Sequence, residues 1–127
     1  EVNDFVSSIS KIDSVRKRMV KTQRLFSENR NIVIEGRDIG SYVFPDAEFK
    51  FFLVADVFER AKRRLKEIKD DSSITINSLV KKLNKRDEID SSRTISPLLK
   101  AQDAIEIDTT SLTVDEQVKE LYNIINK

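Results

Sequence analysis

Cysteine and histidine are absent from this chain of 127 residues, which also contains only two glycines and two prolines. The lack of cysteine excludes disulfides, thiolate catalysis and cysteine-based zinc sites, and it fits a cytoplasmic protein. The lack of histidine excludes imidazole acid–base chemistry and histidine metal sites. No apolar run approaches the roughly 18 residues of a transmembrane span and no signal peptide is visible, so we expect no membrane partner. Any chemistry must rest on arginine, lysine, aspartate, glutamate, serine and threonine.

The chain also lacks an excess of positive or negative charge, although charged residues make up 35% of it. There are 23 lysines and arginines against 22 aspartates and glutamates, which gives a net charge of +1. This balance is unlike the positive excess of a typical nucleic-acid-binding domain. With 39% hydrophobic residues, the chain fits one globular domain that has a heavily charged surface.

Apolar periodicity predicts an α/β fold with a parallel sheet, because helices and strands alternate along the chain. In order, we expect a helix over 11–29, strands over 32–34 and 49–54, helices from 57 and from 76, a strand over 104–107 and a helix from 114. Helix N-caps are predicted from two pairs at capping-box spacing, Asp56 with Glu59 and Thr113 with Glu116. The side chains expected to face the core are Ile12, Val15, Met19 and Phe26 in the first helix, Ala61, Leu65 and Ile68 in the second, and Val114, Val118, Leu121 and Ile125 in the last.

The segment after the first predicted strand places Arg37 and Asp38 where open parallel sheets bind ligands. The guanidinium group of arginine suits a phosphate, and aspartate accepts hydrogen bonds from a base or a sugar. A turn with a surface ion pair would use the same residues. This segment alone therefore leaves both interpretations open.

The helix from Ile76 carries a stripe that changes from apolar to charged without changing face. Steps of three and four residues lead through Ile76, Leu79 and Leu83 to Arg86, Asp90 and Arg93. Charged side chains that face inward need a satisfied network or a polar ligand, because burial of unpaired charge is costly. The alternative is a helix that leaves the core, with Arg86 and Asp90 as an exposed pair worth a few tenths of a kcal/mol.

A third group of cations lies on the predicted helix from 57 and comprises Arg60, Lys62, Arg63, Arg64 and Lys66. Such a run is ordinarily a solvated helix face, and Arg63 has a possible partner four residues on in Glu67. Together with Arg37 and Arg93, the group could instead neutralise a phosphoryl group in transfer, which requires neither cysteine nor histidine. Ser7 with Arg16, and the strand end at 108–110, are further polar positions that fit ordinary surface roles equally well.

Four motifs stand in a fixed order: Glu-Gly-Arg-Asp-Ile-Gly with Val-Phe-Pro-Asp-Ala (35–47), Glu-Arg-Ala-Lys-Arg-Arg (59–64), Arg-Asp-x-x-Asp-x-x-Arg (86–93) with Pro97-Leu98, and Ile-Asp-Thr-Thr-Ser-Leu (107–112). Together they resemble the C-terminal part of bacterial cytidylate kinases, which are nucleoside monophosphate kinases of the P-loop superfamily. The likeness covers essentially the whole chain. It implies transfer of the ATP γ-phosphoryl group to CMP or dCMP with Mg²⁺, in pyrimidine nucleotide metabolism.

The resemblance also implies a role for each matching residue. The cytosine would be read by Ser7, Arg16 and Asp38, the monophosphate held by Arg37 and Arg93, and the ribose contacted by Arg86 and Asp90. The ATP side would be formed by Arg60, Arg63 and Arg64. The catalytic cations would be Arg37, Arg93, Arg63 and Arg64, and no residue is assigned as a metal ligand.

The implied fold is a parallel-sheet P-loop kinase core with a helical lid. Residues 1–10 would be a remnant of the CMP-binding region, residues 11–127 the core, and residues 65–92 the lid region. The family's phosphate loop, G-x-x-x-x-G-K-[ST], has no match, because neither Gly36 nor Gly40 fits that pattern. We therefore expect an incomplete core, in which the central P-loop strand between the strands ending at Glu35 and Val54 is absent.

Loss of a central strand would leave unpaired backbone groups, each costing roughly 1–3 kcal/mol if buried. We expect the chain alone to be inactive and not to hold the native kinase sheet. Either a separate segment with the phosphate loop acts as a partner, or the two strands close up, or another molecule covers them.

Two other functions stay open. The first is a non-catalytic α/β module that binds nucleic acid through its arginine-rich helix, against which the near-neutral charge and the buried aromatic strand speak. The second is a kinase of another nucleoside monophosphate, against which the residue types at Ser7, Arg16 and Asp38 speak.

Overall fold

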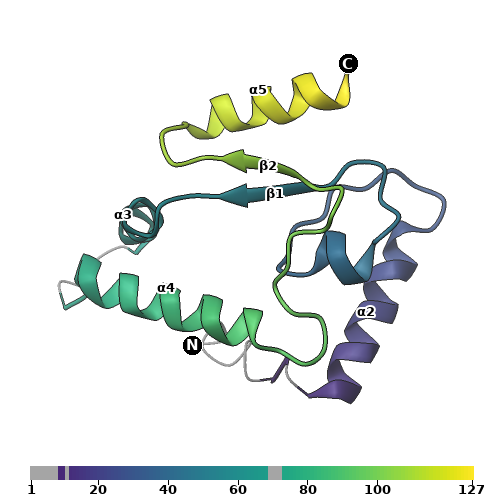
Figure 1. The fold of residues 1–127 in the computed structure, drawn as a ribbon, viewed down its shortest axis with the longest axis horizontal. Coiled ribbons are helices and arrows are strands. Elements are labelled where there is room, and N and C mark those ends of the chain that lie inside the picture. The colour runs from purple at the N-terminus through teal and green to yellow at the C-terminus, as the bar shows by residue number, and fades with distance from the viewer. Residues whose placement is uncertain (1–8, 11, 69–72) are drawn as a thin grey trace. The chain divides into compact units, whose positions relative to one another are not determined.

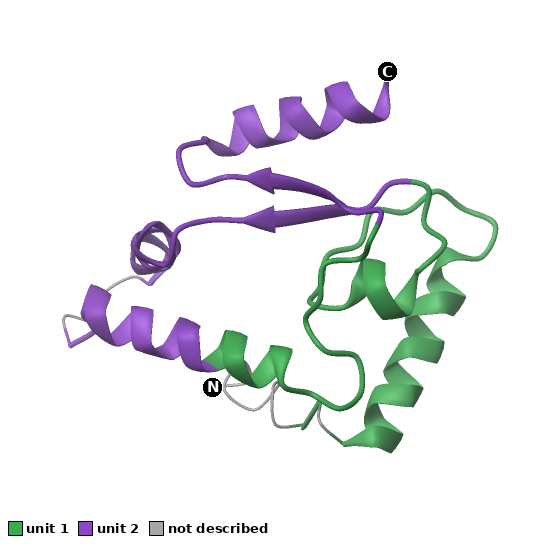
Figure 2. Cartoon of the chain, viewed as in Figure 1, with its two compact units in different colours: residues 1–48, 86–102 green, residues 49–85, 103–127 purple. Residues whose placement is uncertain are grey.

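The computed structural model describes residues 9–10, 12–68 and 73–127. The elements within them are α2 (Asp13–Ser27), a π-helical turn η1 (Ile39–Val43), β1 (Phe51–Val54), α3 (Val57–Glu67), α4 (Ile76–Ser91), β2 (Ile105–Asp108) and α5 (Val114–Ile125) (Figure 1). The chain forms two compact units, each assembled from two stretches of sequence (Figure 2). Unit 1 comprises Glu1–Glu48 and Arg86–Gln102, and unit 2 comprises Phe49–Lys85 and Asp103–Lys127. Among the described helices, none is long and apolar enough to cross a membrane.

Unit 2 contains a two-stranded sheet, in which β1 and β2 are parallel and in register from Phe51 opposite Ile105 to Val54 opposite Asp108. Parallel neighbours require a long crossover, and here the intervening chain includes α3 and α4. The buried apolar side chains of the unit include Ala61, Leu79 and Ile107. The predicted α/β class with a parallel sheet is confirmed, with each strand shifted by a residue or two from its expected bounds.

The loops that follow the two strands are tied together by side-chain hydrogen bonds. Asp56 is the N-cap of α3, and its Oδ1 accepts from the backbone N–H groups of Phe58 at 2.9 Å and Glu59 at 3.2 Å. The backbone N–H of Asp56 donates to Thr110 Oγ1 at 2.9 Å. Thr109 Oγ1 donates to the carbonyl oxygen of Val54 at 3.0 Å. The predicted cap is confirmed, and the polar end of β2 holds the loop after β1.

Helix α5 begins with the predicted capping box of Thr113 and Glu116. The expected burial of its apolar face is wrong, because Val114, Val118 and Ile125 are all exposed. Each strand of the sheet has four residues, while the helix has twelve. A sheet of that size offers too little apolar surface to cover the helix.

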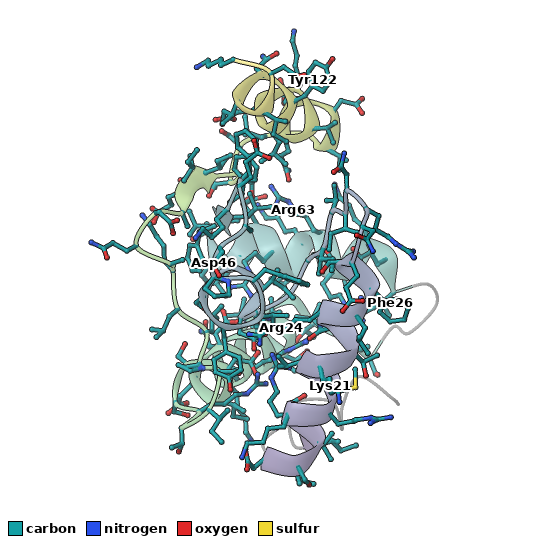
Figure 3. All side chains as sticks on the ribbon, turned by 90° about the vertical axis from the view of Figure 1, so that its right-hand side faces the viewer. Lys21, Arg24, Phe26, Asp46, Arg63 and Tyr122 are labelled. Carbon is teal, nitrogen blue, oxygen red and sulfur yellow. The ribbon has the colours of Figure 1, made fainter. Side chains whose placement is uncertain are left out.

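Helix α2 in unit 1 turns a different face inward from the one that its apolar spacing predicts. Ile12, Met19 and Phe26 are exposed, whereas Val20 is buried. Arg24, one helical turn after Val20 and exposed, donates from Nε to the carbonyl oxygen of Val43 at 2.8 Å and from its terminal nitrogen to that of Tyr42 at 3.0 Å (Figure 3 labels Arg24). Because the neighbour of α2 is the polar backbone of η1, arginine rather than an apolar side chain makes the contact.

Residues 32–34 do not form the predicted buried strand, and the side chain of Val33 is fully exposed at 101%. Strand backbone needs a neighbour to pair its N–H and C=O groups. Within the described residues, the two strands β1 and β2 pair only with each other, so residues 32–34 have no strand beside them.

Candidate functional site

A cavity of about 120 Å³ lies within unit 1. Its wall combines four parts of the chain: Ser10, helix α2, the segment that leads into and begins η1, and the end of α4 with the loop after it. The lining residues are Ser10, Arg16, Gln23, Gly36, Arg37, Asp38, Ile39, Arg86, Asp90 and Arg93.

The π-helical turn fixes the segment that carries Asp38. The carbonyl oxygen of Asp38 accepts from the N–H groups of Tyr42 at 2.9 Å and Val43 at 3.2 Å. Gly36 is needed just before it, because a Cβ atom there would lie 2.6 Å from Cγ1 of Ile39. Absence of a side chain at position 36 therefore lets Ile39 close that side of the cavity.

Asp90 is completely buried, with 0% of its surface exposed, and its carboxylate is the centre of an arginine network. Its Oδ1 forms an ion pair with Arg93, and its Oδ2 lies 3.4 Å from Nε of Arg37 and 3.8 Å from Nε of Arg86. Arg37 also pairs with Asp87 at 2.9 Å. The predicted inward stripe is confirmed, except that α4 ends at Ser91, so Arg93 lies in the following loop.

A second ion pair joins Arg16 on α2 to Asp38, with side-chain exposures of 12% and 4%. Burial, followed by repulsion from Arg93, lowers the pKa of the Arg16 guanidinium group. Burial removes water from the guanidinium group, and Arg93 places a like charge near it, while the Asp38 carboxylate contacts it directly.

Side-chain polar atoms that are buried without a hydrogen-bond partner concentrate at this cavity. Of those in the described part of the chain, all but the hydroxyl of Ser96 belong to cavity-lining residues. They are Oε1 of Gln23 and the Nε atoms of Arg16 and Arg93, together with four atoms that take part in the ion pairs described above, a terminal nitrogen of Arg16, Oδ2 of Asp38, Nε of Arg86 and Oδ2 of Asp90. Buried polar groups are almost always hydrogen-bonded, so a cluster of exceptions calls for a polar ligand.

The charge of the lining favours an anion as that ligand. Four arginines face the cavity against two aspartates, Asp38 and Asp90. Arginine presents a planar fork of N–H donors that matches phosphate and carboxylate oxygens. The aspartates and the glutamine add acceptors for the neutral, hydrogen-bonding part of the same molecule.

The structure thus brings six of the seven predicted CMP-side residues to one cavity: Arg16, Arg37, Asp38, Arg86, Asp90 and Arg93. The seventh, Ser7, lies outside the described residues. Sequence reasoning missed Ser10 and Gln23, which also line the cavity. Gln23 carried a usable signal, because it follows Arg16 by two helical turns and therefore shares its face.

The predicted ATP-side arginines, Arg60, Arg63 and Arg64, lie on α3 in unit 2. Arg63 does not pair with Glu67, as the four-residue spacing suggested, because Arg64 takes that carboxylate at 2.7 Å. The guanidinium group of Arg63, which Figure 3 labels, instead donates to backbone carbonyl oxygens beyond β2, those of Thr109, Thr110 (3.3 Å) and Leu112 (3.5 Å). Among the described residues, no group of three or more acidic side chains could hold a metal ion.

A family model described as cytidylate kinase matches residues 1–127. The chain belongs to the cytidylate kinase family. It is 48% identical to a cytidylate kinase of Clostridioides difficile, and that match covers 99% of this chain and 59% of the relative. It is 50% identical to one of Oceanobacillus iheyensis, covering 100% of this chain and 56% of the relative. A cytidylate kinase of Halalkalibacterium halodurans is 48% identical, with coverage of 100% and 58%. The chain thus spans well under two thirds of the length of these cytidylate kinases.

Proposed function

We propose that this chain is the monophosphate-binding part of a cytidylate kinase that transfers the γ-phosphoryl group of ATP to CMP or dCMP. The observation that carries the proposal is the cavity of unit 1, where buried donors and acceptors without partners stand among four arginines. Membership of the cytidylate kinase family supports the choice of substrate. The reaction would belong to pyrimidine nucleotide metabolism in the cytoplasm.

We assign the roles within the cavity from the resemblance to cytidylate kinases, and the charges of the lining are compatible with them. Arg37 and Arg93 hold the monophosphate, and both guanidinium groups line the cavity. Arg86 and Asp90 contact the ribose. Arg16 and Asp38 read the cytosine together with Ser7, since their ion pair presents both donors and an acceptor.

Binding of ATP requires residues outside the cavity and a phosphate loop that the 127 residues do not contain. We assign Arg60, Arg63 and Arg64 to it, with Arg37, Arg93, Arg63 and Arg64 stabilising the phosphoryl group during transfer. No G-x-x-x-x-G-K-[ST] pattern occurs in the 127 residues, so a phosphate loop would have to come from a segment that acts together with them. Mg²⁺ would arrive with ATP, because the described residues offer it no cluster of ligands.

The same segment would complete the sheet. We propose that it supplies the central P-loop strand, which would pair with residues 32–34 and with β1. Two features support this: Ile32 and Val33 are exposed, and β1 pairs with β2 alone among the described residues. In this assignment residues 1–10 belong to the CMP-binding region, residues 11–127 to the core, and residues 65–92 to the lid.

Calorimetric titration of CMP and dCMP into the 127-residue chain tests the binding half of the proposal. We expect Arg37→Ala to weaken CMP binding by about 1.5–3 kcal/mol, roughly tenfold or more, because a charge-assisted hydrogen bond to phosphate is lost. The matched control is Arg18→Ala, which removes an arginine of α2 that does not line the cavity. Absence of CMP binding, together with RNA binding that falls steeply with salt, would instead favour a nucleic-acid-binding module.

A coupled assay for ADP tests the catalytic half. The pure 127-residue chain should form no ADP from ATP and CMP, because its sequence contains no G-x-x-x-x-G-K-[ST] loop to cradle the ATP phosphates. Turnover by the chain alone would contradict the need for a phosphate loop from elsewhere, whatever the outcome of the titration.

A further inference from the structure

We propose that Ser96 is a positioning residue for the monophosphate site, because its strained backbone conformation sets the place of Arg93 at the cavity of unit 1. The inference rests on the proposed function, in which Arg93 holds the monophosphate. Ser96 itself does not line the cavity. Neither the motifs of the chain nor the assignments above include it.

The backbone of Ser96 has a φ of 54°, which lies in the left-handed region. Residues other than glycine rarely adopt this region, because their Cβ atom comes too close to the following carbonyl oxygen. The residue is also buried, with 2% of its surface exposed, and its hydroxyl has no hydrogen-bond partner in the described part of the chain. The side chain therefore makes no hydrogen bond that would compensate for the strain.

Among the described residues, Asn29 is the other non-glycine residue with a positive φ, at 58°. It comes directly after the C-cap of α2, Glu28. Asparagine is a common left-handed residue at this place, where the conformation ends a helix at little cost. Ser96 has no such role, since α4 ends five residues earlier at Ser91. Its conformation must have another cause.

The cause lies in the loop that follows α4, because this loop begins and ends on Asp90. The guanidinium group of Arg93 pairs with the Asp90 carboxylate, and the backbone N–H of Leu98 donates to the Asp90 carbonyl oxygen at 2.8 Å. The chain must therefore turn back between Arg93 and Leu98. Pro97 cannot turn it with a positive φ, because its ring fixes φ near about −65°. Ser96 makes the turn instead.

Strain of this kind persists only where the surrounding structure fixes it, and it is concentrated at functional sites such as ligand clamps. Here the strained turn sets the position of Arg93, whose side chain is 6% exposed and lines the cavity. With a negative φ at Ser96, the chain would leave the turn in another direction, and the two contacts to Asp90 would no longer form together. Ser96 thereby acts on the phosphate through Arg93.

A double-mutant cycle on the 127-residue chain, measured by calorimetric titration of CMP, tests this route. Ser96→Val introduces a β-branched side chain, for which a positive φ is a clear outlier. We expect it to weaken CMP binding about tenfold. In Arg93→Ala the phosphate contact is already lost, so the same change should then weaken binding by less than about twofold. A residue that only stabilised the fold would not lose its effect in this way.

A glycine variant tests the strain itself. Ser96→Gly should keep the wild-type affinity for CMP within about twofold, because glycine adopts a positive φ without steric cost. Its melting temperature should be no lower than that of the wild type. Ser92→Gly is the matched control, since it makes the same substitution in the same loop at an exposed residue whose φ is not positive. The control should lower the melting temperature by a few degrees.

Two further variants keep the result interpretable. Asn29→Val makes the β-branched substitution at the other left-handed position, outside the cavity, and should leave the affinity for CMP unchanged. Ser96→Thr adds a single methyl group to the native side chain and serves as the second test if Ser96→Val does not fold. It should weaken CMP binding about threefold or more.

Equal losses from Ser96→Val with and without Arg93 would overturn the inference. A melting temperature that falls as far in Ser96→Gly as in Ser92→Gly would also overturn it. Both results would leave the proposed function standing. Absence of CMP binding by the wild-type chain would overturn both.

Discussion

Arg93 forms an ion pair with Asp90, whose carboxylate is fully buried at the end of α4. Arg37 and Arg86 approach the other oxygen of the same carboxylate. One buried negative charge thus holds together three cations that would otherwise repel each other. The network explains how so many arginines can face one cavity before any ligand binds.

Asp90→Asn should destabilise the chain strongly, by about 3–5 kcal/mol, because removal of one partner leaves buried charge uncompensated. Urea denaturation followed by circular dichroism gives the change in the free energy of unfolding. Asp87→Asn is the matched control, since Asp87 pairs with Arg37 but is 27% exposed, and it should cost less than about 1 kcal/mol. Equal costs for the two variants would show that Asp90 is not the centre of the network.

Gly36→Ala should both destabilise unit 1 and weaken nucleotide binding. The added methyl group would lie 2.6 Å from Cγ1 of Ile39, and overpacking of this kind typically costs about 1–3 kcal/mol. Thermal unfolding and CMP titration measure the two effects. The double variant Gly36→Ala with Ile39→Ala removes the clashing atoms, so it should bind CMP more tightly than Gly36→Ala alone. No such recovery would mean that Gly36 is not required for the close approach of Ile39.

Arg63→Ala should cost more stability than Arg64→Ala. Arg63 donates hydrogen bonds to the backbone carbonyl oxygens of Thr109, Thr110 and Leu112. Removal of the guanidinium group leaves these acceptors without a partner, which should lower the free energy of unfolding by about 1–3 kcal/mol. Arg64 pairs with an exposed glutamate, a contact worth about 0–1 kcal/mol. Hydrogen exchange at the amides of 109–112 locates the effect, which should appear as faster exchange in Arg63→Ala only. Equal exchange in both variants would contradict the anchoring role.

The N-terminus of α5 should lose stability in acid. A hydrogen bond from the backbone N–H of Thr113, followed by one from its hydroxyl, lowers the pKa of Glu116 below its ordinary value of 4.5. Because the folded-state pKa is the lower one, the stabilisation is complete above pH 4.5 and is lost as the pH falls through the folded-state pKa.

A comparison of melting temperatures between pH 7 and pH 3 checks this dependence. Glu116→Gln should flatten the acid limb of the curve, and Thr113→Ala should lower stability by about 1 kcal/mol at neutral pH through loss of the cap. An unchanged acid limb in Glu116→Gln would rule out the capping box as its source.

Features that depend on neighbours in sequence were predictable. The caps at Asp56 and Thr113 follow from local spacing, and the charged end of α4 follows from continuing its apolar stripe to Asp90. The arginine network also followed, because a carboxylate on an inward stripe of a helix has few partners except nearby cations. These elements rest on helical geometry alone, which the sequence specifies.

Features that depend on a distant neighbour were not predictable. The buried residue of α2 is Val20, and Arg24 one turn later bonds to a backbone turn, whereas periodicity assigned the inward face to Met19 and Phe26. Arg63 was expected to pair within its own helix, yet it reaches carbonyl groups about 46 residues away in sequence. Residues 32–34 have strand composition, but composition cannot supply the strand beside them.

The central claim is that the arginines of unit 1 surround one nucleotide site, and a crystal structure of the chain with CMP tests it most directly. The account predicts a phosphate group bound between Arg37 and Arg93, with the base beside Arg16 and Asp38. CMP bound elsewhere on the chain, with the cavity of unit 1 empty, would contradict it.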